Sequence, residues 1–429
     1  MENIIIPGGK NLAGNITAIS SKSDLHRLII CACLADKPCK IRFNDHISKD
    51  IIATISCLEA LGAVIKIENQ VICIEKTIDR NNMPQNAVLD CIESGSTARF
   101  LLPVAALLCK GAVITGSGKL PERPFEQLCT SLEAAGAKFS SHTLPITVEE
   151  CANVNDYLEI SGNVSSQYIT GLLFILPLCN CPGIKVTTEL ESAGYVNLTI
   201  DAMCRFGIKV NYSDSIFTCT GIYNTPNCEI DAQGDWSNAA FWLCAPKTGE
   251  TITVSGLSMS SSQPDRAVCD ILSQMGLTVI KNKNSVIVKS TGTTKGINFD
   301  ARNIPDLVPI LSVRAAISEG NTVISGISRL RIKESDRVKS VCDMLSGLGV
   351  QVSYDKDHIC ITGCGESLKG ATVDSYNDHR IAMSAAIAAC FCDGNVNILG
   401  SKAVEKSYPM FYEHYKKLSN INNLETYHT

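Results

Sequence analysis

Apolar and polar positions follow a pattern that repeats along the chain about every seventy residues. In each repeat, a helix with one apolar face ends in a turn of small residues, and a strand follows. The turns contain Gly62, Gly136, Gly207, Gly276 and Gly349. Glycine just after the last helical turn is typical of a left-handed cap. A sixth helix at residues 411–418 closes the series without a glycine. The pattern therefore predicts six copies of one small α/β module.

Each repeat also contains an earlier, more apolar helix, which a turn and a β-rich run follow. These helices are predicted at residues 24–34, 97–108, 167–178, 238–245, 307–317 and 380–390. Helices that are apolar on most sides are buried in the core. Their entry segments are rich in capping residues, but capping does not account for four other side chains there: Lys22, Arg27, Gln167 and Arg380. Helix N-termini carry free N–H groups and partial positive charge, so we expect these entries to bind anions.

The segment 331–337 is the most informative in the chain, with five charged residues among seven. Lys333 and Arg337 are four apart, so on the first turn of a helix they would share one face, with Glu334 beside them. A solvated surface turn is the simpler interpretation. Two cations and a carboxylate at a helix start also suit an anionic substrate that needs proton transfer.

Composition limits the possible classes of protein. A chain of 429 residues, 45% hydrophobic and 19% charged, is expected to fold into two or three globular domains. The net charge of -5 argues against a general nucleic-acid binder. The N-terminus has no signal-peptide pattern, and the longest apolar runs are too short to span a bilayer. We therefore expect a cytoplasmic protein with no membrane partner.

The chain contains 21 cysteines, and several form CxC pairs within or beside apolar runs. Zinc ligation and disulfide bonding are possible interpretations. Buried, reduced thiols are the default for this pattern in a reducing compartment. We find no cluster with metal-ligand spacing, so the residues themselves predict no metal site.

Seven short motifs, in order along nearly the whole chain, resemble those of the EPSP synthase family, the 3-phosphoshikimate 1-carboxyvinyltransferases. They are Lys22-Ser23-Asp24-x-x-Arg27, Glu122-Arg123-Pro124, Ser165-Ser166-Gln167, Ile304-Pro305-Asp306, Lys333-Glu334-x-Asp336-Arg337, Asn377-Asp378-His379-Arg380 and Lys406-Ser407-Tyr408-Pro409. Any one motif is weak, but seven in the same order are specific.

The resemblance implies an α/β fold: a two-domain inside-out α/β barrel built from six βαβαββ repeats, three per domain. This agrees with the six modules counted from the apolar pattern. The implied first domain contains residues 1–20 and 235–429, and the second contains residues 21–234.

The reaction implied by the resemblance joins shikimate 3-phosphate and phosphoenolpyruvate. The 5-hydroxyl attacks C2 of the enolpyruvyl group while C3 is protonated, and the tetrahedral intermediate then eliminates phosphate. The family needs no metal or cofactor and is inhibited by glyphosate at the phosphoenolpyruvate site. We expect a monomer whose partners are these two small molecules.

The resemblance also implies the site residues. The catalytic group is Lys22, Asp306 and Glu334, with Asp306 as the base for the 5-hydroxyl and Glu334 as the acid/base at the methylene carbon. The positions for shikimate 3-phosphate are Lys22, Ser23, Arg27, Ser165, Ser166, Gln167, Ser192, Tyr195, Asp306 and Lys333. The positions for phosphoenolpyruvate are Lys22, Gly95, Arg123, Gln167, Arg337, Arg380 and Lys406.

Some of these residues also have a purely structural interpretation. Ser23 and Ser165 could be helix caps, and Asp306 follows a proline where an N-cap is common. Tyr195 could be an ordinary core residue, and Gly95 could serve close backbone approach.

The chain departs from the family pattern at three places. Glu93-Ser94-Gly95-Ser96 stands where many members have Asn-Ala-Gly-Thr, and an acid there could repel phosphoenolpyruvate or pair with Arg99. Arg329 replaces a common Asn, and Ala193 replaces a common Lys. These changes bear on substrate and inhibitor binding.

Two other functions remain open. One is the sister enolpyruvyl transferase that acts on UDP-N-acetylglucosamine, which usually carries a cysteine before an Arg-Pro pair. The segment Gly116–Arg123 has no cysteine, which argues against that enzyme. The other is an anion-binding protein without activity, which would be expected to lose Asp306 or Glu334.

Overall fold

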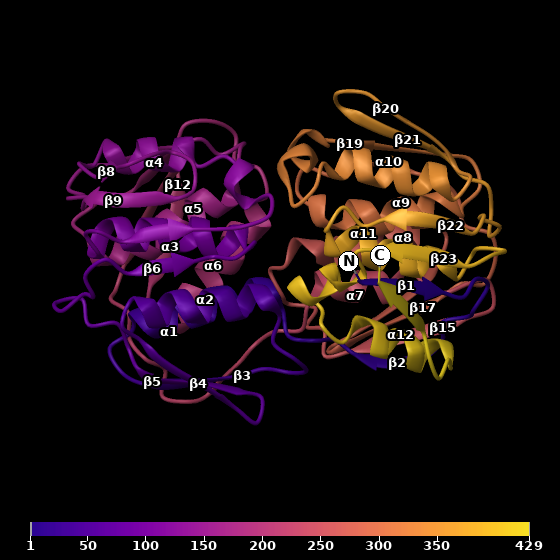
Figure 1. Cartoon of the computed structure of the whole chain (residues 1–429), viewed down its shortest axis with the longest axis horizontal. Helices are drawn as coiled ribbons and strands as arrows, with labels where there is room; N and C mark the ends of the chain where they lie inside the picture. Colours follow the sequence, from indigo (N-terminus) through magenta and orange to yellow (C-terminus); the bar gives the residue numbers. More distant parts are fainter. Residues whose placement is uncertain (1, 429) are drawn as a thin grey trace. The chain divides into compact units, whose positions relative to one another are not determined.

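The computed structural model describes residues 2–428 and divides the chain into two compact units (Figure 1). Unit 1 comprises Met1–Ser21 and Gln233–Thr429, and unit 2 comprises Lys22–Ala232. The sequence prediction places the domain boundaries at residues 20/21 and 234/235, within two residues of these limits.

The described residues form six four-stranded sheets of one topology, three in each unit. Within each sheet, the first strand pairs parallel with the second, and the two remaining pairings are antiparallel. In spatial order, the sheets of unit 1 are β2 (Gly14–Thr17), β15 (Thr251–Ser255), β17 (Ser285–Lys289), β16 (Thr278–Asn282); β18 (Asn298–Asp300), β19 (Asn321–Ser325), β21 (His358–Thr362), β20 (Gln351–Tyr354); and β22 (Ala371–Asp374), β23 (Val396–Leu399), β1 (Glu2–Ile6), β24 (Glu425–His428). Those of unit 2 are β14 (Ile230–Asp231), β3 (Cys39–Arg42), β5 (Val71–Lys76), β4 (Val64–Glu68); β6 (Val88–Asp90), β7 (Val113–Thr115), β9 (Ile146–Glu150), β8 (Lys138–Phe139); and β10 (Leu158–Ile160), β11 (Ile184–Val186), β13 (Ile216–Thr220), β12 (Lys209–Ser213).

Two helices complete each module. The first helices of the modules are α1 (Lys22–Leu34), α3 (Gly95–Leu108), α5 (Ser166–Ile175), α7 (Trp236–Leu243), α9 (Val308–Ala316) and α11 (His379–Ala389). The second helices are α2 (Lys49–Ala60), α4 (Glu126–Glu133), α6 (Ala193–Arg205), α8 (Val268–Gln274), α10 (Arg337–Gly347) and α12 (Phe411–Ser419). The first helices are buried along nearly their whole length, as their apolar sequences require. The prediction of six βαβαββ modules is confirmed.

Left-handed residues end the second helices, as the repeat pattern predicts. Gly62, Gly136, Gly207, Gly276 and Gly349 have φ values of 98°, 89°, 85°, 101° and 83°. The sixth helix, α12, ends at Asn420, which has a φ of 55° and takes the place of the missing glycine. Asparagine tolerates this conformation better than most residues with a side chain.

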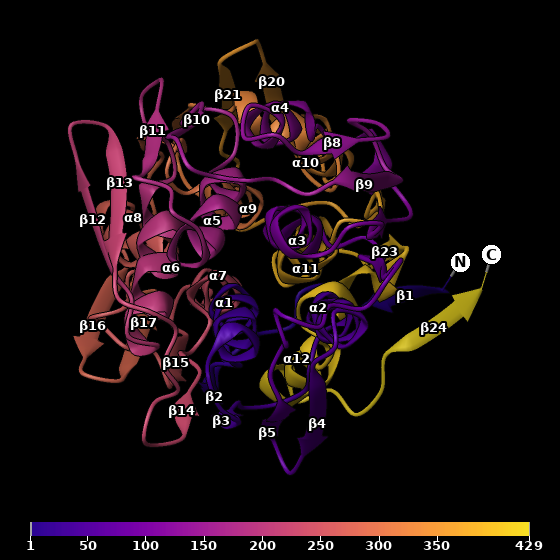
Figure 2. The same ribbon diagram turned by 90° about the vertical axis from the view of Figure 1, so that its left-hand side faces the viewer.

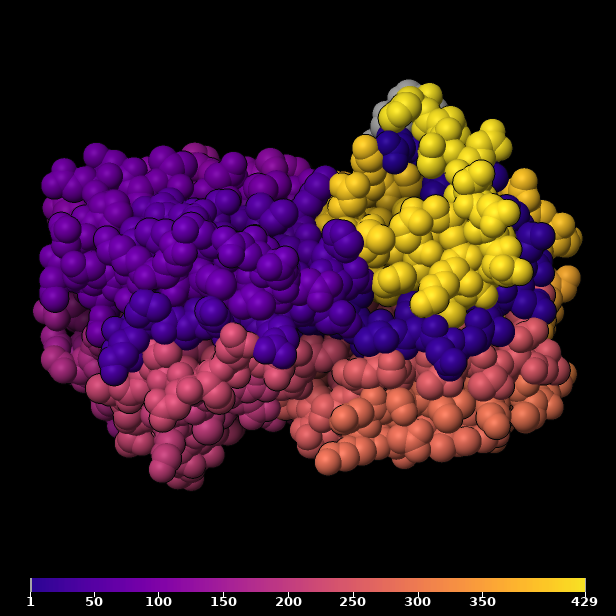
Figure 3. Space-filling model, turned by 90° about the horizontal axis from the view of Figure 1, so that it is seen from below, coloured from indigo at the N-terminus to yellow at the C-terminus, as the bar shows by residue number. Residues whose placement is uncertain are grey.

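The two ends of the chain meet in one sheet of unit 1. Strand β1 lies between β23 and β24 and pairs antiparallel with both, so that Ile4 is opposite Ile398 on one side and Thr426 on the other (Figure 2). Residues from the two ends also adjoin on the surface of this unit (Figure 3). The last module of unit 1 is therefore completed by the first residues of the chain.

Each unit has its own apolar core. In unit 1 the indole of Trp242 stacks on Phe411 at 4.9 Å, and its Nε1 donates to the hydroxyl of Tyr408 at 3.2 Å. Tyr408 is 1% exposed and belongs to the last of the seven motifs. This aromatic cluster fixes the segment that follows Lys406. Across residues 2–428, no helix has both the length and the apolar character needed to cross a membrane.

Candidate active site

Unit 1 brings three separate chain segments together in a cluster of alternating charges. The cluster comprises Asp306, Lys333, Glu334, Arg337, Asp378 and Arg380. Asp306 lies in the 3-10 helix η4 (Pro305–Leu307), and Lys333 follows the 3-10 helix η5 (Ser328–Ile332). Arg337 begins α10, and Asp378 and Arg380 lie at the start of α11. Both helices therefore begin within the cluster.

Arg337 is the centre of this cluster and is only 1% exposed. Its Nη1 donates to Asp306 Oδ1 at 2.7 Å, and its Nη2 donates to Glu334 Oε2 at 2.7 Å. Its Nε donates to Asp378 Oδ2 at 2.8 Å. Burial lowers the pKa of Arg337, but Asp378, Glu334 and Asp306 raise it more, and the result lies well above the ordinary value. Arg337 is therefore a permanent cation, and its guanidinium binds the carboxylates of Asp306, Glu334 and Asp378.

Asp306 is the carboxylate that the cations surround most closely. Arg380 Nη1 donates to its backbone carbonyl and Nη2 to Oδ2, each at 3.0 Å. Lys333 Nζ lies 3.7 Å from Oδ1. Burial raises the pKa of Asp306, but Arg380, Lys333 and Arg337 lower it more, to well below its usual range. Asp306 is therefore ionised and, in this state, a weak base.

The N-cap interpretation of Asp306 is not favoured by its position. The residue lies inside η4, while the N-cap positions of η4 and α9 are Ile304 and Leu307. Its carboxylate points to cations instead.

The prediction that Lys333 and Arg337 share one helical turn is wrong. Helix α10 begins at Arg337 with Asp336 as its N-cap, and Lys333 has an extended backbone four residues earlier. The two cations nevertheless meet, because both reach Asp306. Burial lowers the pKa of Lys333 to about 8, with a smaller lowering by Arg337 and Arg329 against the opposing effect of Asp306 and Glu334.

Arg329, one of the departures from the family pattern, binds the backbone of unit 1. Its Nη2 donates to the carbonyl of Arg302. It therefore adds positive charge near Lys333 and helps to lower the pKa of that amine.

A further buried acid lies close to this cluster. Asp265 belongs to the 3-10 helix η3 (Pro264–Ala267) and is 2% exposed. Burial and the nearby Asp306 raise its pKa to about 6, while Arg380 and Ser237 act in the opposite direction.

Lys406 lies beside the turn that precedes α11. It ends the 3-10 helix η6 (Ser401–Lys406), and its Nζ donates to the carbonyl of Asn377 at 2.6 Å. Asn377 and Tyr376 are both left-handed, with φ values of 54° and 52°. This tight turn places Asp378 at the N-cap of α11, where Oδ1 accepts from Arg380 N at 2.9 Å.

Unit 2 contains the other group of predicted site residues, and Lys22 begins its first helix. Lys22 Nζ bonds Asp50 Oδ2 on α2 at 2.8 Å. Ser23 is the second residue of α1 and so does not occupy the cap position that the structural interpretation requires. Its carbonyl accepts from Arg27 Nη1 at 2.7 Å.

Arg27 connects α1 with α6. Its Nε donates to Thr199 Oγ1 at 2.8 Å, and its Nη2 donates to the carbonyl of Tyr195 at 3.0 Å. Burial lowers the pKa of Arg27 to about 10, opposed by Asp24. The half-buried Tyr195 and the left-handed Ser192, with a φ of 56°, lie at the start of the same helix. The structure therefore brings Ser23, Arg27 and Tyr195 together.

Gln167 connects α5 with α3. Its Oε1 accepts from Arg99 Nη1 at 2.8 Å, and its Nε2 donates to Ser96 Oγ at 2.9 Å. Ser165 is the N-cap of α5, since its hydroxyl accepts from Gln167 N at 3.3 Å, and Ser166 is the first residue of that helix. The cap interpretation of Ser165 is thus confirmed.

Gly95 lies against the guanidinium of Arg123. A Cβ added to Gly95 would come within 2.8 Å of Arg123 Cζ, closer than real Cβ atoms approach a neighbour. The absence of a side chain at residue 95 is therefore a condition for the observed position of Arg123, which is 8% exposed.

Sequence reasoning missed two acids that hold predicted site cations. Asp50 pairs with Lys22, and Asp378 pairs with Arg337. Asp378 stands in a motif but was given no role. Its place just before a predicted helix, where aspartate is a common N-cap, was the signal that could have shown a structural role. No local pattern connects Asp50 with Lys22, because the two residues are 28 positions apart.

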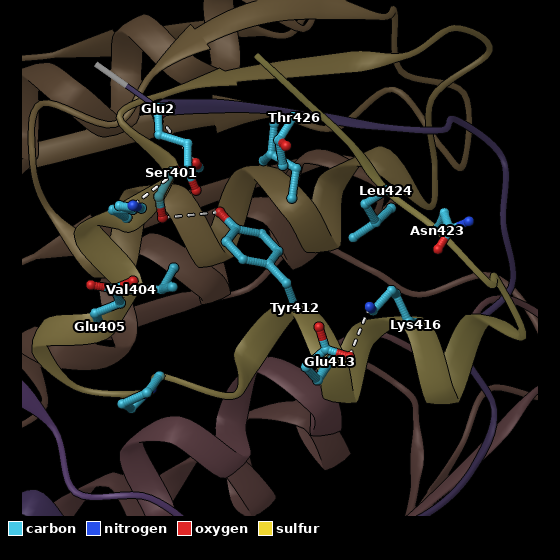
Figure 4. A pocket seen from close by; sticks show the side chains of 13 residues that line it. Glu2, Ser401, Val404, Glu405, Tyr412, Glu413, Lys416, Asn423, Leu424 and Thr426 are labelled. Atoms are coloured by element: carbon cyan, nitrogen blue, oxygen red, sulfur yellow. Dashed lines mark hydrogen bonds and ion pairs between the residues drawn. The ribbon is translucent and has the colours of Figure 1, made fainter. Parts of the chain in front are cut away.

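The cavity in Figure 4 lies on other elements of unit 1. It has a volume of about 250 Å³ and is lined by residues of β1, η6, α12 and β24, including Tyr412 and Lys416. None of the predicted site residues lines it. Over residues 2–428, no three His, Cys, Asp or Glu side chains are grouped so that they could hold a metal ion, and the 21 cysteines are free thiols.

Comparisons with known proteins identify the same family that the motifs resemble. The family model of EPSP synthase (3-phosphoshikimate 1-carboxyvinyltransferase) matches residues 6–415. A 3-phosphoshikimate 1-carboxyvinyltransferase of Clostridium novyi is 40% identical over 437 aligned residues, which cover 98% of each chain.

Solved structures confirm the predicted fold class. An EPSP synthase of Acinetobacter baumannii has a TM-score of 0.82 at 24% identity, with 100% of both chains covered. The enolpyruvyl transferase NikO of Streptomyces tendae has a TM-score of 0.77 at 17% identity, with 100% of this chain and 99% of that chain covered. The fold is thus common to different enolpyruvyl transferases, and the sequence match distinguishes among them: the chain belongs to the EPSP synthase (3-phosphoshikimate 1-carboxyvinyltransferase) family.

Proposed function

We propose that this chain transfers the enolpyruvyl group of phosphoenolpyruvate to the 5-hydroxyl of shikimate 3-phosphate, with release of phosphate. The family match from residue 6 to residue 415 carries the proposal. The cluster of unit 1 supports it, because it combines buried cations for anionic substrates with two carboxylates able to move protons.

The proposed reaction has two steps. The 5-hydroxyl oxygen forms a bond to C2 of phosphoenolpyruvate, its proton passes to a base, and C3 gains a proton to become a methyl group. C3 then loses a proton, the C2–O bond to phosphate breaks, and the double bond forms again. We assign Asp306 as the base for the hydroxyl, Glu334 as the acid and base at C3, and Lys22 as a cation that contacts both substrates.

Substrate binding would make Asp306 a stronger base. Arg380 and Lys333 now hold its carboxylate in the ionised form. The phosphate or carboxylate of a bound substrate competes for these cations, so it weakens their hold on Asp306 and raises the pKa of that residue. The proton acceptor would thus become active when substrate arrives.

The remaining assignments divide by substrate. For shikimate 3-phosphate we propose Lys22, Ser23, Arg27, Ser165, Ser166, Gln167, Ser192, Tyr195, Asp306 and Lys333. For phosphoenolpyruvate we propose Lys22, Gly95, Arg123, Gln167, Arg337, Arg380 and Lys406. We also propose a cytoplasmic monomer.

The direct test is release of inorganic phosphate from phosphoenolpyruvate with each acceptor in turn. We expect release with shikimate 3-phosphate and none with UDP-N-acetylglucosamine or without an acceptor. Equal or faster release with UDP-N-acetylglucosamine would replace the proposal by the sister activity. Binding of both substrates by calorimetry without any phosphate release would instead favour an anion-binding protein.

The low pKa of Lys333 predicts how substrate use depends on pH. Lys333 loses its positive charge as the pH rises through about 8, so kcat/KM for shikimate 3-phosphate should fall about tenfold per pH unit above that value. Lys333→Arg should shift this limb to higher pH, because the guanidinium stays protonated. A wild-type profile that is flat up to about pH 9 would contradict the assignment of Lys333.

A further inference from the structure

Asp378 is a fully buried carboxylate to which the proposed mechanism gives no part. Its exposed fraction is 0%, although it stands at the start of a helix. A buried carboxylate is costly unless cations and hydrogen-bond donors surround it. Its partners therefore indicate what its negative charge is used for.

Four donors from two helix starts converge on Asp378. Arg337 donates twice, from Nε to Oδ2 at 2.8 Å and from Nη2 to Oδ1 at 3.4 Å. Ser335 Oγ donates to Oδ2 at 3.1 Å, and Arg380 N donates to Oδ1 at 2.9 Å. One carboxylate thus joins the start of α10, which carries Arg337, to the start of α11, which carries Arg380.

The two bonds to Arg337 determine how its guanidinium is turned. A guanidinium is planar, and its five N–H groups point in fixed directions. Asp378 binds the Nε side, so Nη1 and the outer N–H of Nη2 point to Asp306 and Glu334. Without Asp378, the side chain could rotate about its last bonds and still keep its charge.

We propose that Asp378 is a positioning residue for the enolpyruvyl transfer. It orients Arg337 toward Asp306 and Glu334, and it fixes the first turn of α11 so that Arg380 reaches Asp306. The inference rests on the proposed function, because that activity is its readout.

If Asp378 acted through its charge alone, its removal would change KM in the direction opposite to that expected from loss of orientation. Removing a negative charge beside Arg337 makes the surroundings more positive, which should lower the KM for the anionic phosphoenolpyruvate. Loss of orientation should instead raise KM and lower kcat, because a small displacement of a binding or catalytic group costs on the order of 10²-fold in rate.

The test variant is Asp378→Asn. The asparagine oxygen can still accept from Arg380 N and cap α11, but its amide cannot accept from Arg337 Nε. We expect kcat/KM for phosphoenolpyruvate to fall on the order of 10²-fold. The matched control is Asp336→Asn, which changes the N-cap of α10, whose carboxylate accepts from Val338 N and Lys339 N. The control should stay within about twofold of wild type.

A double-mutant cycle separates positioning from general structure. If Asp378 acts through Arg337, adding Asp378→Asn to Arg337→Ala should lower kcat/KM by only a small further factor. That remaining factor measures the effect of Asp378 on Arg380. The proposal would be overturned if Asp378→Asn lowered kcat/KM as much in the Arg337→Ala protein as in the wild type. A KM for phosphoenolpyruvate below the wild-type value in Asp378→Asn alone would also overturn it. If Asp378→Asn does not fold, Ser335→Ala serves instead. It removes one bond to Asp378, and an unchanged KM and kcat there would also overturn the proposal.

Failure of the inference and failure of the proposed function give different results. The wild-type chain is assayed first with phosphoenolpyruvate and shikimate 3-phosphate. No phosphate release by the wild type contradicts the proposed function. Wild-type release together with a normal Asp378→Asn variant contradicts only the positioning role.

Discussion

Asp306→Asn is expected to lower kcat by about 10²–10⁴-fold, the usual contribution of a general acid or base. An amide has nearly the shape of the carboxylate but cannot take the proton of the 5-hydroxyl. The KM for phosphoenolpyruvate should stay level or fall, because Arg380 and Lys333 no longer share their charge with Asp306. Steady-state kinetics with each substrate varied in turn give both constants.

Glu334→Gln should lower kcat by a similar factor, since its carboxylate is the proposed acid and base at C3. The control for both variants is Asp343→Asn, which removes an exposed carboxylate of α10 that pairs with Lys339 at 2.8 Å. It should leave kcat within about twofold of wild type, as most surface substitutions do. Near-normal turnover of Glu334→Gln would remove that residue from the proton transfer and favour Lys406.

Arg380→Ala is expected to raise the KM for phosphoenolpyruvate on the order of 10²-fold. Truncating one member of a buried, hydrogen-bonded charge pair costs about 2–5 kcal/mol, which corresponds to this range or more. Arg380 also supplies two hydrogen bonds to Asp306, so the pKa of Asp306 should rise in the variant and move the acid limb of the kcat profile to higher pH. Initial rates over a range of pH measure both effects.

Two further variants show why KM rises in Arg380→Ala. Arg380→Lys keeps the charge but loses the planar fork, so its KM should lie between those of wild type and Arg380→Ala. Arg331→Ala is the control from the same charged segment of unit 1, because that side chain is directed to the backbone of Asp355 and the ring of Tyr354. An equal rise of KM in Arg331→Ala would mean that general loss of positive charge, and not Arg380 in particular, explains the effect.

The module architecture could be predicted because its signals are local. Buried helices such as 97–108 and 380–390 have apolar residues on most sides, and the structure has helices at Gly95–Leu108 and His379–Ala389. A glycine at the end of a second helix, such as Gly207, adopts the left-handed conformation that its position requires. The left-handed conformation of Asn420 was not predicted, because asparagine is also common in turns and loops with other conformations.

The charged segment 331–337 shows where local reasoning fails. Spacing by four indicates a shared helical face only if both residues are in one helix. Asp336 ends that possibility, because its carboxylate accepts from Val338 N and Lys339 N and starts α10 after Lys333. Lys333 and Arg337 meet only because Asp306, about thirty residues earlier, attracts both.

The sequence by itself determined the number and order of the modules, the helices that form the cores, and the set of polar residues that the seven motifs contain. These depend on periodicity, capping and residue order, which act within a few positions of the chain. Only the tertiary structure decided which carboxylate neutralises which cation. Asp378 with Arg337 and Asp50 with Lys22 are pairs between different helices. These pairs form only once the modules have packed, and removal from water then strengthens the attraction between the charges.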